Sequence, residues 1–313
     1  MKVIVFGSNG LVGSSISRVL ETSNKVDELV KSNRLELDLF KNDDVQQFVK
    51  DQKPNVIINA AAKVGGIHAN NTKRTEFILE NLKINMNILE SCLQMPDIKI
   101  INLGSSCIYP LNAKNPISES EFMNGKLEPT NSPYAMAKLS AIEIGRSMSK
   151  QFGHQILNLM PTNLYGPNDY FSDLDSHVIP ALIHRMQKTI EKGKKEFKVW
   201  GSGSPLREFL YVDDLSNFIN FIIDKEIKDD LINVGSGQEI SIKDLAMLIK
   251  ELMNFKGDII FDSSKPDGNP RKLLDSSLLS KLGWNEFTDL KSGLESTIHW
   301  YKSNPKSNRI KIN

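Results

Sequence analysis

The stretch VIVFGSNGLVG, residues 3–13, decides the fold of this chain. Val3–Phe6 is a β-rich run that ends at a glycine, and Leu11–Leu20 carries apolar residues at helical spacing. The glycines are spaced GxxGxxG, one residue longer in the first gap than GxGxxG. Glycine permits a tight turn, and a helix N-terminus offers free N–H groups to a pyrophosphate. The unit predicts a dinucleotide-binding loop, with a plain glycine turn as the alternative. The loop residues are Gly7, Ser8, Asn9, Gly10, Leu11, Val12 and Gly13.

Strand and helix patterns alternate beyond this unit. Apolar strands are expected at Val56–Asn59, Lys99–Leu103 and Gln155–Met160, with helices at 43–52, 75–93 and 134–152. This alternation predicts βαβ units in a parallel sheet, and right-handed crossovers place helices on both faces. We therefore predict an α/β fold with a doubly wound, Rossmann-type parallel sheet.

The second half of the chain predicts a smaller lobe. After Pro161 the sequence becomes rich in Gly, Pro, Asn and Asp, which is typical of a functional loop. A strand at 231–234 and helices at 177–191, 215–223, 242–253, 277–282 and 290–302 follow. We place the dinucleotide domain at 1–164 plus about 207–235, and an α/β substrate-binding lobe at about 165–206 and 236–313.

Length and composition limit the possible functions. With 313 residues, the chain can bury a large core without cross-links. Its formal net charge of +1 gives no electrostatic footprint for nucleic acid, and no apolar run reaches the ~20 residues that span a membrane. The two cysteines, Cys92 and Cys107, show neither a disulfide framework nor metal-ligand spacing. We therefore expect no bound metal and a reducing, cytoplasmic compartment.

The stretch Tyr134-Ala-Met-Ala-Lys138 carries the strongest catalytic signal. Positions i and i+4 lie on one face of a helix, so the phenol and the ammonium can converge. The ammonium would lower the phenol pKa from its usual value near 10. A surface pair is the alternative. The order of glycine loop, Ser105 and then this pair, each at the end of a successive unit, favours a site.

Four further side chains are candidates. Ser105 follows an apolar strand and can hydrogen-bond a substrate ketone or cap a helix. Cys107 can be a thiolate base near positive charges, or an inert buried cysteine. His177 can exchange protons near neutral pH or cap a helix. Arg34 can bind a 2′-phosphate bidentately, or it can be a plain surface arginine.

Seven blocks of the sequence resemble those of the GDP-L-fucose synthases, a family of extended short-chain dehydrogenases/reductases. The blocks are AAKVGGI (61–67), GSSCIYP (104–110), PTNLYGP (161–167), SHVIPAL (176–182), WGSG (200–203), REFL (207–210) and KPDGNPRK (265–272). They run in order, and the resemblance covers about residues 1 to 303. The CIYP and SHVIP runs are more specific than the general dehydrogenase pattern.

The resemblance implies conversion of GDP-4-keto-6-deoxy-D-mannose to GDP-L-fucose. In this reaction C3 and C5 of the sugar are inverted, and NADPH then reduces the C4 ketone, which acidifies the hydrogens on both neighbouring carbons. By resemblance, Cys107 is the base and His177 the acid. Ser105 and Tyr134 bind the enolate oxygen. Tyr134 also protonates this oxygen during reduction, while Lys138 lowers the phenol pKa and holds the nicotinamide ribose.

Binding residues transfer from the family by position. The NADP contacts would be the glycine loop together with Arg34, Asp38, Lys138, Pro161, Thr162, Asn163, Leu164 and His177. The sugar-nucleotide contacts would be Arg185, Trp200, Arg207 and Asp267. A core role for Trp200 and a turn role for Asp267 are the alternatives. The family also implies a homodimer through the helices starting near Thr75 and Tyr134.

Other functions fit the sequence less well. A related enzyme such as a GDP-colitose synthase shares the ketone chemistry and the motifs. A simple 4-ketoreductase would not need Cys107 together with His177. A noncatalytic dinucleotide-binding regulator would not need the intact set of Ser105, Tyr134 and Lys138. A 4,6-dehydratase would carry an Asp-Glu pair after the serine motif, and the sequence has none there.

Overall fold

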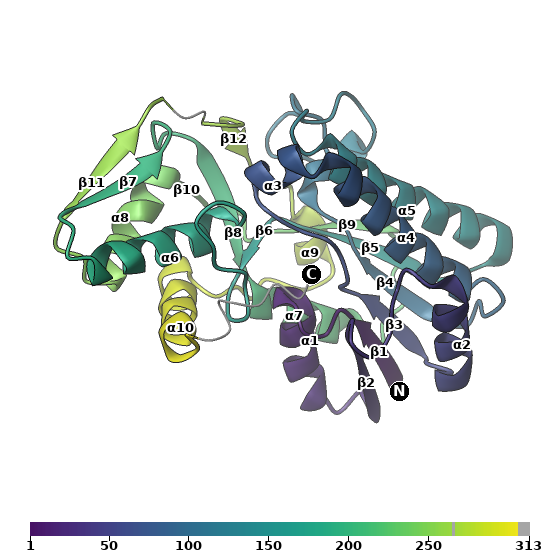
Figure 1. The fold of residues 1–313 in the computed structure, drawn as a ribbon. Coiled ribbons are helices and arrows are strands. Elements are labelled where there is room, and N and C mark those ends of the chain that lie inside the picture. Colours follow the sequence, from purple (N-terminus) through teal and green to yellow (C-terminus); the bar gives the residue numbers. More distant parts are fainter. Residues whose placement is uncertain (265–266, 306–313) are drawn as a thin grey trace.

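The computed structural model describes residues 1–264 and 267–305 (Figure 1). Lys265 and Pro266 of the 265–272 block, and residues 306–313 of the predicted lobe, lie outside the described residues. The described chain forms a larger α/β domain and a smaller lobe, and α3 (Ile67–Thr72) and β12 (Arg271–Lys272) lie where the two parts meet.

A parallel sheet forms the centre of the larger domain. Over the described residues, six strands pair in the order β2-β1-β3-β4-β5-β9, and every pairing is parallel. They are β1 (Lys2–Phe6), β2 (Glu28–Ser32), β3 (Val56–Asn59), β4 (Lys99–Leu103), β5 (Ile156–Pro161) and β9 (Leu231–Val234). The strand order reverses between β1 and β3. In open α/β sheets a ligand crevice lies at such a point, outside the carboxyl ends of the strands.

Successive residues of β1 contact opposite layers of helices. Val3 and Val5 pack in a hydrophobic cluster with α1 and α7, whereas Ile4 and Phe6 pack in a second cluster with α2, α4 and α5. This period of two is that of a strand buried on both faces. The helices are α1 (Leu11–Glu21), α2 (Asn42–Gln52), α4 (Arg74–Ser91), α5 (Ser132–Phe152) and α7 (Val212–Ile222). The predicted doubly wound fold is confirmed.

Short strands and helices from separate parts of the chain build the smaller α/β lobe (Figure 1). In one sheet β10 (Glu239–Ser241), β8 (Leu206–Tyr211) and β12 pair in that order, and β6 (Asn163–Tyr165) also pairs with β8. In the other, β11 (Asp258–Asp262) pairs with β7 (Glu196–Trp200). The helices α6 (Val178–Glu191), α8 (Ile242–Leu252) and α10 (Leu290–Ser303) share one apolar cluster with these strands other than β12.

The chain returns to the larger domain before its last helix. Leu279 of α9 (Ser277–Lys281) and Trp284 pack in the cluster that contains β9 and α7. The sequence had placed residues 236–313 entirely in the lobe. The structure differs because the apolar side chains of this segment cover the β9 end of the large sheet.

None of the helices in 1–264 and 267–305 has the length and apolar character of a membrane span. In the same residues, no group of His, Cys, Asp and Glu side chains is arranged to hold a metal ion.

Candidate active site

The glycine loop links the carboxyl ends of β1 and β2. The N–H groups of Gly7 and Ser8 both donate to the carbonyl of Ser32, at 3.0 and 3.1 Å, and the Ser8 hydroxyl donates to the same oxygen. Gly10 then caps α1 without a side-chain hydrogen bond. The first N–H groups of the helix therefore receive no capping side chain from this residue and face the end of the sheet.

Two of the glycines are required by the geometry of this loop. Gly7 has φ +77°, a left-handed conformation that favours glycine. A methyl group at position 13 would lie only 2.1 Å from the carbonyl oxygen of Gly7. The compact turn and the uncapped helix N-terminus fit a bound dinucleotide, because a pyrophosphate can approach the backbone and accept from its N–H groups.

Arg34 and Asp38 lie just beyond the end of β2. Arg34 is exposed in a turn, with its guanidinium carbon 5.4 Å from the centre of the Phe40 ring. The Asp38 carboxylate accepts from the N–H of Phe40 at 3.0 Å, so it stabilises a local turn. Arg34 is accessible to a phosphate, as its predicted role requires. The Asp38 contact to adenine stays a prediction.

Four predicted catalytic residues gather at the carboxyl end of β4. Ser105 caps a short 3-10 helix, η1 (Ser106–Ile108), and its hydroxyl accepts from the N–H of Cys107 at 3.3 Å. The Lys138 ammonium donates to the carbonyl of Leu103, two residues before Ser105, at 2.6 Å. Lys138 also lies 5.8 Å from the centre of the Tyr134 ring, on the same helix. The i, i+4 spacing on α5 therefore brings this pair to the serine.

The pKa of Tyr134 moves in the direction opposite to our expectation. Burial raises the pKa of the phenol, and the nearby Cys107 thiolate would raise it further. Lys138 does not offset these effects because its ammonium binds the carbonyl of Leu103 and not the phenol oxygen. Burial also lowers the pKa of Lys138 to about 8. Without ligands, Tyr134 is thus a neutral phenol, the form that can donate a proton.

Cys107 is buried, with 8% of its surface exposed. Burial raises the pKa of its thiol, while the charge of Lys272, the hydroxyl of Ser105 and the charge of Lys138 each lower it. The expected thiolate is therefore opposed by burial. Lys272 lies in the 265–272 block but could not be predicted as a neighbour of the thiol, because nothing in that block links it to the cysteine.

His177 lies at the start of α6, on the lobe side of the site. It is exposed and is the N-cap residue of this helix. The N–H of Gly66 donates to the carbonyl of Asp175 at 2.8 Å, which fixes the segment before His177 against the 65–66 turn. Phe77 lies close to Gly65, since a methyl group added at Gly65 would be 3.3 Å from its ring. The same ring packs edge-on against Tyr134. The catalytic role of His177 stays a prediction.

The PTNL segment joins the large sheet to the lobe. Pro161 ends β5, and the N–H of Thr162 donates to the carbonyl of Val234 at 3.0 Å. The hydroxyl of Thr162 and the amide of Asn163 both donate to the carbonyl of Glu208, at 3.2 and 2.8 Å. Leu164, in β6, packs at the edge of the cluster around the sheet. These residues lie at the carboxyl end of β5, as their predicted cofactor role requires.

The four predicted sugar-nucleotide residues form one group in the lobe. Arg185 lies over the Trp200 ring, with 5.1 Å from guanidinium carbon to ring centre, and Trp200 is 43% exposed. The carboxylate of Asp267 accepts from the N–H and the hydroxyl of Ser202, at 2.7 and 2.8 Å. Burial lowers the pKa of Arg207, and the charge of Asp267 opposes this effect. The exposed indole face rules out a pure core role for Trp200.

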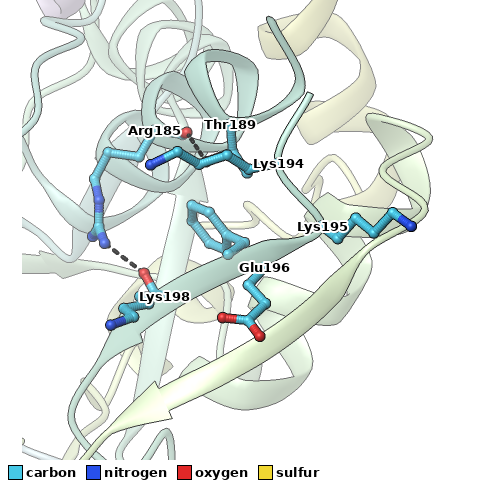
Figure 2. Close-up of a pocket in the computed structure, with 7 residues that line it drawn as sticks. Arg185, Thr189, Lys194, Lys195, Glu196 and Lys198 are labelled. Carbon is cyan, nitrogen blue, oxygen red and sulfur yellow. Dashed lines mark hydrogen bonds between the residues drawn. The ribbon is translucent and has the colours of Figure 1, made fainter. Parts of the chain in front are cut away.

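A separate pocket lies beside this group, between α6 and β7. It is lined by Arg185, Thr189, Lys194, Lys195, Glu196, Phe197 and Lys198. The Arg185 guanidinium donates to the carbonyl of Lys198, at 2.5 Å (Figure 2). Apart from Arg185, the pocket contains none of the predicted site residues.

The fold and the site define a class of enzyme. A glycine loop with an uncapped helix, a serine after β4 and a Tyr-Lys pair on α5 meet at one edge of a parallel sheet. The sequence pattern of the NAD dependent epimerase/dehydratase family matches residues 3–235, so the class is that of dinucleotide-dependent epimerases and oxidoreductases.

Full-length relatives narrow this class. GDP-L-fucose synthase 1 of Arabidopsis thaliana is 47% identical over 303 residues, covering 97% of this chain and 94% of the relative. GDP-L-fucose synthase of Escherichia coli (strain K12) is 44% identical over 312 residues, covering 97% of each. A solved GDP-L-fucose synthetase of Naegleria fowleri, bound to NADP, has a TM-score of 0.91 at 29% identity, covering 99% of this chain and 95% of that one. The chain belongs to the NAD dependent epimerase/dehydratase family and, within it, to the GDP-L-fucose synthases.

Proposed function

We propose that this enzyme converts GDP-4-keto-6-deoxy-D-mannose to GDP-L-fucose by inverting C3 and C5 and then reducing C4 with NADPH. The observation that carries the proposal is the cluster of a thiol, a phenol, a hydroxyl and an ammonium at the carboxyl end of β4. A reductase needs only the last three. The additional thiol of Cys107, next to Ser105, supplies a base for inversion.

The inversion requires proton transfers at the carbons beside the ketone. The thiolate of Cys107 takes the proton from C3 or C5, and the electron pair moves onto the C4 oxygen as an enolate. Ser105 and the neutral phenol of Tyr134 can both donate hydrogen bonds to that oxygen. His177, at the start of α6, returns a proton to the opposite face of the carbon, and the thiol and the imidazole then exchange protons with solvent to reset.

The reduction uses the same oxygen site. NADPH, when bound, supplies the hydride. Tyr134 donates its proton to the C4 oxygen, and Lys138, held on the carbonyl of Leu103, would bind the nicotinamide ribose. Arg34, exposed after β2, supplies the charge that a 2′-phosphate needs. Because the phenol begins neutral, no prior protonation is needed for this step.

The lobe holds the nucleotide part of the substrate. Arg185 and Arg207 carry the positive charges that pair with a diphosphate, and the exposed face of Trp200 offers a stacking surface. The carboxylate of Asp267 is already bonded to Ser202, so we propose that it fixes the turn after Trp200 and contacts the substrate with its remaining acceptor capacity.

The decisive experiment identifies the product. The protein is incubated with GDP-4-keto-6-deoxy-D-mannose and NADPH, and the sugar is identified by NMR. GDP-L-fucose is expected. Recovery of the ketosugar, or of a 4-reduced sugar without inversion, would overturn the proposal. A GDP-4-keto-3,6-dideoxy sugar offered in competition tests the colitose-type alternative, which is excluded if the 6-deoxy substrate reacts with the higher kcat/KM.

Replacing Cys107 separates the two half-reactions. We expect Cys107→Ser to reduce solvent-deuterium incorporation into the ketosugar by at least about 100-fold, since a hydroxyl is a far weaker base than a thiolate. NADPH affinity, measured by fluorescence titration, should stay unchanged. Cys92→Ser is the matched control, because Cys92 is buried in the apolar cluster that contains α2 and α4. Normal exchange by the Cys107→Ser protein would rule out this cysteine as the base.

We further propose a cytoplasmic homodimer formed through α4 and α5. The two cysteines are free, as in a reducing compartment. Leu79 and Met86 of α4 are 50% and 47% exposed, and Met136 of α5 is 47% exposed. The seven-residue spacing of Leu79 and Met86 places both on one face of the helix. An apolar face of this kind supports an isologous four-helix interface.

A further inference from the structure

Lys272 lies on a segment that is fixed on both sides of the site. On the lobe side it is paired with Arg207 in the parallel register of β12 and β8. Two residues later, the N–H of Leu274 donates to the buried carboxylate of Glu208, at 3.1 Å. These bonds hold β12 against the strand that carries a predicted substrate arginine.

The same segment is bonded to the stretch that follows Cys107. The N–H of Leu273 donates to the side chain of Asn115 at 2.7 Å, and its carbonyl accepts from the N–H of Ile117 at 2.8 Å. Leu274 packs in the same apolar cluster as Ile108, the residue next to Cys107. The backbone around Lys272 and the turn that carries the thiol are therefore parts of one packed unit.

The charged and polar groups that act on the thiol come from several elements. Lys272 reaches it from β12, Lys138 and Tyr134 from α5, and Ser105 from the same turn. Burial lowers the pKa of Lys272 itself; the charge of Cys107 opposes this effect, Arg207 adds to it and Glu128 opposes it. Within 1–264 and 267–305, the ammonium of Lys272 has no hydrogen-bond or ion-pair partner, whereas that of Lys138 is bonded to a carbonyl. Of the charged groups near Cys107, Lys272 does most to lower the pKa of the thiol.

We propose that Lys272 is a positioning residue whose ammonium stabilises the thiolate of Cys107 against the cost of its burial. The proposal rests on the proposed role of Cys107 in inversion. Lys272 takes no proton from the sugar and bonds to no reacting atom. It sets the fraction of protein in which the thiol has already lost its proton to solvent. It thereby links the lobe to the base: the strand that lies beside Arg207 also carries the charge that prepares Cys107.

The test measures the titration of Cys107 in the free protein. Thiolate formation is followed by its ultraviolet absorbance in the Cys92→Ser background, and the Cys92→Ser/Cys107→Ser protein is subtracted. Lys272→Met and Lys272→Gln remove the charge by two chemistries, and Lys272→Arg keeps it. Lys243→Met, at an exposed lysine elsewhere in the lobe, is the matched control. Thermal unfolding confirms that each variant is folded.

We expect both neutral variants to move the thiol titration upward by about one pH unit. Deuterium exchange into the ketosugar at neutral pH should fall about tenfold and recover at higher pH. The Arg and Lys243 variants should titrate like the parent protein. An unchanged titration in both neutral variants overturns the proposal, and a raised KM in that case assigns Lys272 to substrate binding only. Because the titration needs neither sugar nor NADPH, its result does not depend on the outcome of the product experiment.

Discussion

Lys138 is the residue at which stability and function conflict most directly. Only 2% of it is exposed, and burial lowers its pKa from 10.5 to about 8. In the unfolded chain the group binds its proton up to a higher pH than in the folded protein. Below about pH 8 the free energy of unfolding is therefore lowered by the full cost of burying the charge. It increases as the pH rises from about 8 to 10.5.

Replacing this lysine with an apolar residue should stabilise the protein and inactivate it. We expect Lys138→Met to raise the free energy of unfolding at pH 7 by roughly 1 to 3 kcal/mol, because the cost of a buried charge exceeds the value of one hydrogen bond to Leu103. Denaturant unfolding measures the gain, and NADPH oxidation with the ketosugar measures the loss. The gain should shrink at pH 10, and a destabilised variant at pH 7 would contradict the assignment.

Some of the residues near Cys107 could be predicted from the sequence, and others could not. Ser105, Cys107, Tyr134 and Lys138 were predictable because each follows a strong local pattern: the end of a buried strand, or an i, i+4 pair on a long helix. Lys272 was not, since its place depends on the register of a two-residue strand against β8. The neutral state of Tyr134 was missed for a related reason. The bond from Lys138 to Leu103 joins two elements that no local pattern connects.

At the scale of elements, the glycine loop depends on one close backbone contact. In Gly13→Ala the added methyl would lie 2.1 Å from the carbonyl oxygen of Gly7, so α1 must shift away from β1. We expect a loss of about 2 to 3 kcal/mol in the free energy of unfolding, together with weaker NADPH binding. In Gly10→Ala the nearest atom would lie at 3.6 Å, so this control should fold normally. Equal unfolding curves for the two variants would refute the packing argument.

Glu208 connects β8 to two segments that cross between the lobe and the large domain. Its carboxylate accepts from the N–H groups of Gly237 and Leu274, at 2.7 and 3.1 Å. Glu208→Gln leaves one of these groups without an acceptor, at a cost of about 1 to 3 kcal/mol, and loosens β12 beside Arg207. We expect a raised KM for the sugar nucleotide and a lower unfolding temperature.

The control for this variant lies on α8, away from β12. Glu251→Gln weakens an exposed ion pair with Lys291 and should cost less than about 1 kcal/mol. If the two glutamine variants had the same KM and the same unfolding temperature, Glu208 would have no special part in holding β12.

Long, buried elements were predicted well and short ones poorly. Strands β3, β4 and β9 begin and end where the apolar runs predicted, because strands buried on both faces read as continuous apolar segments. The lobe strands β6, β10 and β12 have three, three and two residues, too few to show a period. Strand β7 does alternate exposed and buried residues, but it spans only five residues and lies in a two-stranded sheet.

At the scale of the whole molecule, the proposed dimer can be tested without affecting the site. Leu79→Glu/Met86→Glu places two carboxylates on the apolar face of α4, and desolvating them in an interface is unfavourable. We expect a dimer to become a monomer in analytical ultracentrifugation, with an intact fold. Met247→Glu, on the equally exposed face of α8, is the control. A wild-type protein that sediments as a monomer would end the proposal.

The division of the chain predicted from the sequence stays a prediction, and two elements lie elsewhere than it expects: β8 pairs in a sheet of the lobe, and α9 packs with the large domain. The change of texture after Pro161 lies where β5 ends and β6 pairs with β8. The return of α9 to the large domain was not visible. A five-residue helix with three apolar neighbours does not reveal which of two clusters it will fill.

The lobe is assembled from three separate lengths of chain: the part between β6 and β8, the part from β10 to β12, and α10. No single cut can release it, and no simple gene fusion can replace it with the lobe of another sugar-nucleotide enzyme. A change of substrate in this architecture must therefore arise by exchange of individual side chains within the lobe, while the three lengths of chain stay in place.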